Sequence, residues 1–187
     1  MTNAFLNTEL LDRAIVFAVR AHAGTERRGK GFPYIVHPME AVSIVATMTD
    51  DQELLAAAAL HDTVEDTDVT LDDIRAAFGD RIATLVAFES DDPEEDDWHA
   101  RKQAGINRLA AAPYDAKVVA LGDKLSNIRA IARDFEEKGN AVWQLFHAKD
   151  VTEHKWRYQG LVEAFRDLEG TFAFREFEYW VKRVFGE

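Results

Sequence analysis

The sequence contains no cysteine, and this absence excludes disulfide bonds, thiolate metal sites and cysteine nucleophiles together. It also lacks any apolar run close to the roughly 20 residues that a membrane-spanning helix needs, so we expect no membrane partner. Residues 1–14 have neither the basic start nor the apolar stretch of a secretory signal. Together these absences predict a cytoplasmic protein.

Positive charge is scarce as well. The chain has 22 Lys and Arg residues against 34 Asp and Glu residues, which gives a formal net charge of −12. General nucleic-acid binding needs basic patches that neutralise phosphates, so this class of function is excluded. Six carboxylates fall within residues 91–97. This acidic run fits either a solvated loop or the rim of an active site.

Strand patterns are nearly missing, because only residues 34–36 show a brief β-type signal. Apolar residues instead recur at helical spacing along most of the chain. Thr8 and Asp51 are expected to cap helices, and Thr70 with Asp73 resembles a capping box before a helix that Gly79 stops. The expected helices begin near residues 8, 51, 70, 80, 98, 115, 150 and 172, with a short apolar stripe at 142–146. No repeat or linker divides the 187 residues, so the sequence predicts one all-α domain.

Histidine and carboxylate pairs carry the candidate chemistry, at His37, His61-Asp62, Glu65-Asp66 and Asp123. Because proline suits the first helical position, Pro38 would place His37 at a helix start. On one continuous helix, His61 and Glu65 would lie a turn apart, as would Asp62 and Asp66. The residues on one turn of the helix could then bind a cation, while the carboxylates on the next turn carry out proton transfer.

Two imidazoles and two carboxylates form a mixed nitrogen and oxygen donor set. Such a set suits Mn²⁺ or Fe²⁺, tolerates Zn²⁺, and has too much nitrogen for Mg²⁺ or Ca²⁺. A cation held in this way favours metal-assisted hydrolysis of a phosphoester. Individual residues also fit structural roles, with His22 as a hydrogen-bonded core histidine and Glu65 and Asp66 as solvated turn residues.

The densest positive cluster is RRGK at residues 27–30. A polyanionic substrate that faces several carboxylates needs such a cluster, and arginine can bind phosphate through two parallel hydrogen bonds or stack on a base. We therefore expect this segment to contact substrate, with a basic surface turn as the alternative.

Five short motifs resemble the hydrolase domain of RelA/SpoT-type alarmone enzymes, within the HD phosphohydrolase superfamily. They are AHAG at 21–24, PYIVHP at 33–38, LHDTVEDT at 60–67, FG at 78–79 and GDKLSNIR at 122–129. The resemblance covers about residues 8–135, and beyond these the chain is similar, more loosely, to the small stand-alone hydrolases. It implies a single HD-type helical bundle over residues 1–187, with the motif core at 8–135 and a helical extension at 139–187.

The resemblance also implies a function, namely removal of the 3′-pyrophosphate from ppGpp or pppGpp with Mn²⁺ or another divalent transition metal. By the same resemblance the metal ligands fall on His37, His61, Asp62 and Asp123, and the water-activating and proton-transferring carboxylates on Glu65 and Asp66. The nucleotide contacts fall on Arg28, Tyr34 and Asn127. A second basic family position falls on Gly29, so Lys30, one place later, is the candidate for that contact.

The chain departs from the long enzymes at Ala120 and Ala130, where that family has a lysine and a threonine. These departures keep other substrates open, namely an adenosine alarmone, a nucleoside monophosphate or the 2′-phosphate of NADPH. A nucleotide sensor that binds without hydrolysis is a further alternative. The aromatic C-terminal helix could support a homo-oligomer or could pack within the chain.

Overall fold

The computed structural model describes residues 7–90 and 96–186, and every regular element within these ranges is a helix. The all-α prediction is therefore confirmed. The α-helices are α1 (Glu9–Ala21), α2 (Val36–Val45), α3 (Gln52–Leu60), α4 (Thr63–Asp66), α5 (Leu71–Phe78), α6 (Asp80–Glu89), α7 (Trp98–Ala110), α8 (Tyr114–Lys138), α9 (Val151–Ala164) and α10 (Phe172–Phe185). Two 3₁₀ turns, Gly139–Leu145 and Arg166–Leu168, flank α9. Most of the acidic run, residues 91–95, lies outside the described residues.

Local capping signals set several helix ends as expected. The Asp51 carboxylate accepts from the Glu53 amide at the start of α3. Thr70 and Asp73 form both bonds of a capping box at the start of α5, and Gly79 ends that helix with φ of 92°. Thr8 differs from the expectation, because its hydroxyl donates to the Asp12 carboxylate and caps no backbone amide.

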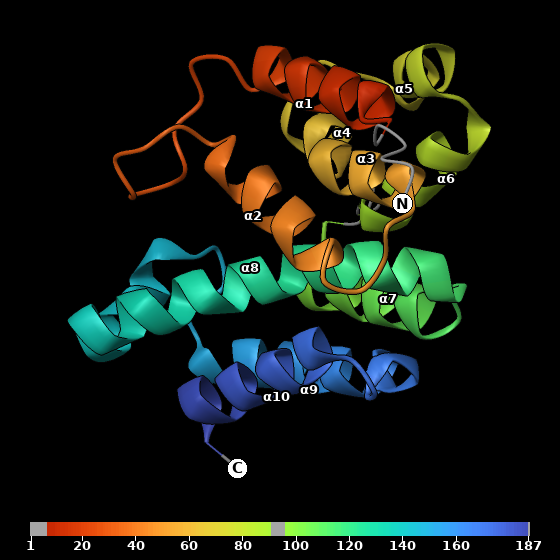
Figure 1. The fold of residues 1–187 in the computed structure, drawn as a ribbon. Coiled ribbons are helices and arrows are strands. Elements are labelled where there is room, and N and C mark those ends of the chain that lie inside the picture. Colours follow the sequence, from red (N-terminus) through yellow and green to blue (C-terminus); the bar gives the residue numbers. More distant parts are fainter. Residues whose placement is uncertain (1–6, 91–95, 187) are drawn as a thin grey trace, which may run out of the picture.

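The long helix α8 crosses the middle of the molecule, with α1 to α6 on one side and α9 and α10 on the other (Figure 1). Helix α3 packs against α1, α2, α6 and α8. All its residues from Leu54 to Leu60 are consequently buried, which explains why this segment is apolar on every face. Helix α10 packs against α8 and α9. The single domain over residues 1–187 stays a prediction. Within the described residues, no helix combines the length and apolar character that a bilayer span requires.

Gly122 allows α8 to approach α2 closely. A Cβ atom at this position would lie 2.6 Å from Val45 Cγ2 and 3.0 Å from the Ala41 carbonyl oxygen. Alanine would gain at most about 1 kcal/mol in helix propensity, whereas overpacking a core typically costs about 1–3 kcal/mol. We expect Gly122→Ala to lower the free energy of unfolding by roughly 1–2 kcal/mol, measured by urea denaturation. Gly170→Ala is the matched control, since no described atom lies within 4 Å of its added Cβ. Equal stability of the two variants would contradict this packing.

Candidate active site

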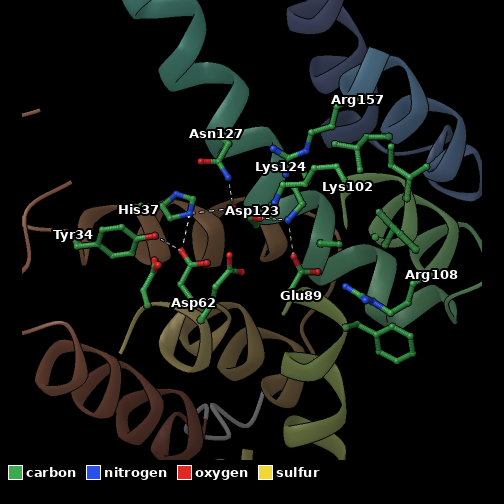
Figure 2. Close-up of a pocket in the computed structure, with 18 of the residues that line it drawn as sticks. Tyr34, His37, Asp62, Glu89, Lys102, Arg108, Asp123, Lys124, Asn127 and Arg157 are labelled. Carbon is green, nitrogen blue, oxygen red and sulfur yellow. Dashed lines mark hydrogen bonds and ion pairs between the residues drawn. The ribbon is translucent and has the colours of Figure 1, made fainter. Parts of the chain in front are cut away.

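Three helices bring the predicted metal-binding residues to one buried point. His61 and Asp62 follow the end of α3. His37 comes from α2 and Asp123 from the middle of α8, and Figure 2 shows both side chains beside Asp62. The Nε2 atoms of His37 and His61 lie 3.2 Å apart. His37 Nε2 lies 3.2 Å from Asp62 Oδ2 and 3.0 Å from Asp123 Oδ1. One ligand atom from each of His37, His61 and Asp123 falls within 4.8 Å of the others, so these groups can share one ion.

Hydrogen bonds behind both imidazoles fix which ring nitrogen faces the cluster. Ser126 donates to Glu40 (2.8 Å), so its oxygen accepts from His37 Nδ1 at 2.8 Å. His61 Nδ1 donates to the Ala58 carbonyl at 2.8 Å. Each Nε2 therefore faces the centre, in the arrangement usual for metal-binding histidines.

Electrostatics favour a cation at the same point. Burial opposes charge on His61, but the Asp62 and Asp123 carboxylates outweigh it and raise the pKa of this imidazole well above its usual value. Burial likewise opposes ionisation of Asp62, yet contact with His61 and His37 holds its pKa well below the usual range. Without a metal, the raised pKa means that His61 Nε2 carries a proton facing these carboxylates. A divalent cation would take the place of that proton and bind both Nε2 atoms beside two ionised carboxylates. The donor set thus fits a transition metal.

The helix expected to run through residues 61–66 is interrupted, which corrects the prediction of one continuous helix. Helix α3 ends at Leu60 and α4 starts at Thr63. The Thr63 hydroxyl donates to the Leu60 carbonyl at 2.7 Å, and a side-chain bond of this kind competes with the backbone pattern of a helix. The bond from the Asp66 amide to the Asp62 carbonyl, 2.9 Å, is retained, so these two residues still lie one turn apart. Pro38 is the third residue of α2 rather than the first.

A cavity of about 240 Å³ opens beside the cluster. The predicted catalytic residues Glu65 and Asp66 line it from α4, and Tyr34 donates its hydroxyl hydrogen to Asp62 at 2.7 Å. Basic side chains line other parts of this cavity, namely Arg27, Lys102, Arg108, Lys124 and Arg157. Acidic and basic groups thus face one solvent-accessible space, as phosphate chemistry requires.

The basic segment at 27–30 reaches the site through Arg27, which the sequence analysis did not single out. Its guanidinium bonds the Tyr34 hydroxyl at 3.2 Å and also the Asn127 side chain. Arg28 is exposed and lines a second, adjoining cavity, as does Lys30. The Arg27 amide bonds the Phe32 carbonyl (3.0 Å), and the Lys30 amide bonds the Arg27 carbonyl (2.9 Å), so Arg28 and Gly29 lie in a turn that begins at Arg27. The sequence carries no signal that separates Arg27 from Arg28.

Glu89 is a second residue that the sequence analysis missed. Its side chain is 3% exposed and accepts from Lys124 Nζ at 2.9 Å, and Lys124 also bonds Asp123. Burial raises the pKa of Glu89, while the Lys124 ammonium opposes that shift. Lys124 thereby links Glu89 to the candidate metal-binding cluster, as the dashed lines in Figure 2 show.

His22 is buried as expected, at 3% exposed, but neither ring nitrogen has a hydrogen-bond partner among the described residues. Its ring stacks on Tyr34 with centroids 4.8 Å apart. Burial lowers the pKa of His22 against the opposing pull of Asp62 and Asp66. The neutral ring therefore serves as packing behind Tyr34.

Known proteins resemble this chain in sequence and in fold. The curated guanosine-3′,5′-bis(diphosphate) 3′-pyrophosphohydrolase of Aquifex aeolicus is 36% identical over 147 residues, covering 73% of this chain and 20% of that protein. The chain thus spans about a fifth of that long relative. A Danio rerio protein of the same name is 33% identical over 133 residues, covering 68% of this chain and 72% of the relative.

A solved structure shares the fold over nearly the whole chain. It belongs to a metazoan ortholog of SpoT that hydrolyses ppGpp, and it aligns with a TM-score of 0.78 at 23% identity, covering 96% of this chain and 97% of that one. Residues 14–150 match the HD domain family. That range contains the buried histidine and aspartate cluster and all residues that line the cavity beside it except Arg157 and Leu161. The chain belongs to the HD domain family.

Proposed function

We propose that the protein is a metal-dependent phosphohydrolase that removes the 3′-pyrophosphate from ppGpp or pppGpp, leaving GDP or GTP. The observation that carries this proposal is the convergence of His37, His61, Asp62 and Asp123 beside a cavity lined by both carboxylates and basic side chains. The names of the Aquifex aeolicus and Danio rerio relatives support the substrate.

His37, His61, Asp62 and Asp123 would hold the metal, for which we propose Mn²⁺ on the basis of the mixed donor set. When bound, such an ion neutralises phosphoryl charge and lowers the pKa of water. Asp123 is held from behind by Lys124, and its Oδ1 also accepts from Asn127 Nδ2 at 2.5 Å. These contacts fix the orientation of the Asp123 carboxylate toward the cluster.

Glu65 and Asp66 are proposed to move the proton from the attacking water toward the leaving nucleotide. Both line the cavity from α4, the helix that directly follows Asp62. A carboxylate so placed can act as general base and then return the proton as general acid.

Basic and polar groups are proposed to hold the nucleotide. Arg27, Tyr34 and Asn127 form one bonded group at the junction of the two cavities. Arg108 donates to the Ser90 carbonyl at 2.8 Å, while its buried Nε has no partner among the described residues. With Arg157 and Lys102 on the same wall, this side of the cavity suits the phosphates of an anionic substrate.

Turnover of ppGpp by the Mn²⁺-loaded protein tests the proposal directly. We expect GDP and pyrophosphate in equal amounts, resolved by anion-exchange chromatography, and loss of both products after chelation of the metal. An adenosine alarmone, NADPH and a nucleoside monophosphate are assayed in parallel, because Ala120 and Ala130 line the two cavities without the longer side chains of the long enzymes. Intact ppGpp alongside hydrolysis of one of these nucleotides would overturn the proposed substrate.

A further inference from the structure

The second cavity, about 330 Å³, continues from the first and shares Arg27, Tyr34, Asp66, Asn127 and Arg157 with it. Its lining combines aliphatic and aromatic side chains, Ile131, Leu145, Phe146 and Tyr158 among them, with charged groups that include Lys30 and Asp134. Apolar walls beside convergent polar groups are typical of a site that binds a flat organic ring. No step proposed above uses the far end of this cavity.

One face of α8 runs from the metal-binding cluster to that far end. Asp123, Asn127, Ala130 and Asp134 follow one another at helical spacing, and the last three line the second cavity. Eleven residues of α-helix rise about 16 Å, which is enough for a nucleotide that carries a pyrophosphate. A substrate with its 3′-phosphoester at Asp123 would pass its ribose by Asn127 and direct its base toward Asp134.

Lys30 and Asp134 form a largely buried ion pair at this far end. Lys30 Nζ lies 2.5 Å from Asp134 Oδ2, and their side chains are 18% and 11% exposed. Lys138 Nζ lies 3.4 Å from Asp134 Oδ1. Burial opposes ionisation of Asp134, but the bond from Lys30 outweighs it and lowers the pKa of this carboxyl, which is therefore a carboxylate at neutral pH. A carboxylate offers about four acceptor positions, so two lysines leave room for further donors.

The Watson–Crick edge of guanine matches this pair. Guanine presents two adjacent donors, N1–H and the exocyclic N2–H₂, next to the O6 acceptor. A carboxylate can accept from both donors while an ammonium group donates to O6. Adenine places an acceptor, N1, where the carboxylate needs a donor, and hypoxanthine lacks the exocyclic N2 donor.

We propose that Asp134 and Lys30 recognise the Watson–Crick edge of guanine, so that this chain selects guanine nucleotides over adenine and hypoxanthine nucleotides. This inference rests on the proposed function for the placement of the phosphoester at Asp123. It assigns to Lys30 a contact with the base, and it adds Asp134 as a specificity-determining residue.

The test compares kcat/KM for guanosine, inosine and adenosine nucleotides that each carry a 3′-pyrophosphate. We expect the wild type to prefer guanosine over adenosine by about 10- to 100-fold, the discrimination that a bidentate base contact gives, with inosine between them. Asp134→Ala should remove most of that preference. Asp134→Asn should shift it further toward adenosine, because an amide matches the donor and acceptor of adenine.

Glu137→Gln is the matched control, an exposed carboxylate on the same helix that lines neither cavity, and it should retain the wild-type ratios. The ion pair between Asp134 and Lys30 could instead have only a structural role, holding the segment at 27–30 against α8. Asp134→Ala and Asp134→Asn would then lower kcat/KM by the same factor for all three nucleotides. That result, or a wild type without base preference, overturns the inference.

Calorimetric binding of GDP, IDP and ADP separates this inference from the proposed function. A wild type that hydrolyses none of the three pyrophosphorylated nucleotides refutes the function. In that case the binding affinities alone test the recognition of guanine by Asp134 and Lys30. Equal affinity for GDP and ADP would refute this recognition.

Discussion

Replacing His61 by alanine is expected to abolish hydrolysis and to weaken Mn²⁺ binding by more than about 100-fold, since loss of a partner outside the ligand set already costs 10- to 100-fold in other metal sites. The His61 side chain is 1% exposed and its Nε2 lies 3.0 Å from Asp62 Oδ2. We expect no other side chain to take the place of the His61 imidazole as a metal ligand. His61 directly follows α3, and the backbone there cannot shift without disrupting the packing of this buried helix. Calorimetric titration of Mn²⁺ into the metal-free variant measures the affinity, and chromatography of the nucleotide products measures turnover.

His147→Ala provides the matched control, since His147 is exposed and lies outside both cavities. This variant should bind Mn²⁺ and hydrolyse substrate as the wild type does. Far-UV circular dichroism of both variants establishes that the helical fold is retained. A folded His61→Ala protein with wild-type Mn²⁺ affinity would refute the metal assignment, whatever its activity.

Helix ends were largely predictable because their signals are local. Thr70, Asp73 and Gly79 form a capping box and a positive-φ stop whose partners lie within a few residues. The break after Leu60 was not predictable from apolar spacing, because the Thr63 hydroxyl competes with the backbone there and residues 61–66 otherwise fit a helical repeat. Periodicity thus locates a helix but does not show which of its backbone bonds a side chain replaces.

Some residues of the site were also predictable from local sequence motifs, and others were not. The sequence analysis grouped His37, His61, Asp62 and Asp123 through motifs, and the structure brings these four together, while their roles stay predictions. Glu89 was missed because its partner Lys124 lies 35 residues away and only the packing of α6 against α8 joins them.

The pairing of Lys30 with Asp134 spans 104 residues. The RRGK cluster marks Lys30 in the sequence, but no local pattern marks Asp134 as its partner. Long-range ion pairs around the cavity therefore had to come from the structure. The predicted metal ligands, by contrast, lie on short motifs that can be recognised in the sequence.

Replacing Glu65 by glutamine is expected to lower kcat by about 10²- to 10⁴-fold while leaving the affinity for nucleotide and Mn²⁺ within a few-fold of wild type. Glutamine keeps the size of the side chain but cannot accept a proton at neutral pH. Since proton transfer matters only in the transition state, its loss should appear in kcat and not in ground-state binding. Steady-state kinetics and calorimetric binding of GDP, a product, measure the two effects separately.

Asp68→Asn is the matched control for this experiment, because Asp68 is an exposed carboxylate just after α4 that lines neither the first nor the second cavity. It should keep kcat within about 2-fold, as expected for a surface substitution remote from the chemistry. If Glu65→Gln retains the wild-type kcat, the proton transfer would be assigned to Asp66 instead. Asp66 lines both cavities and lies one turn after Asp62. Loss of Mn²⁺ affinity in Glu65→Gln would instead make Glu65 part of the metal-binding set, and the assignment of α4 to proton transfer would then fail.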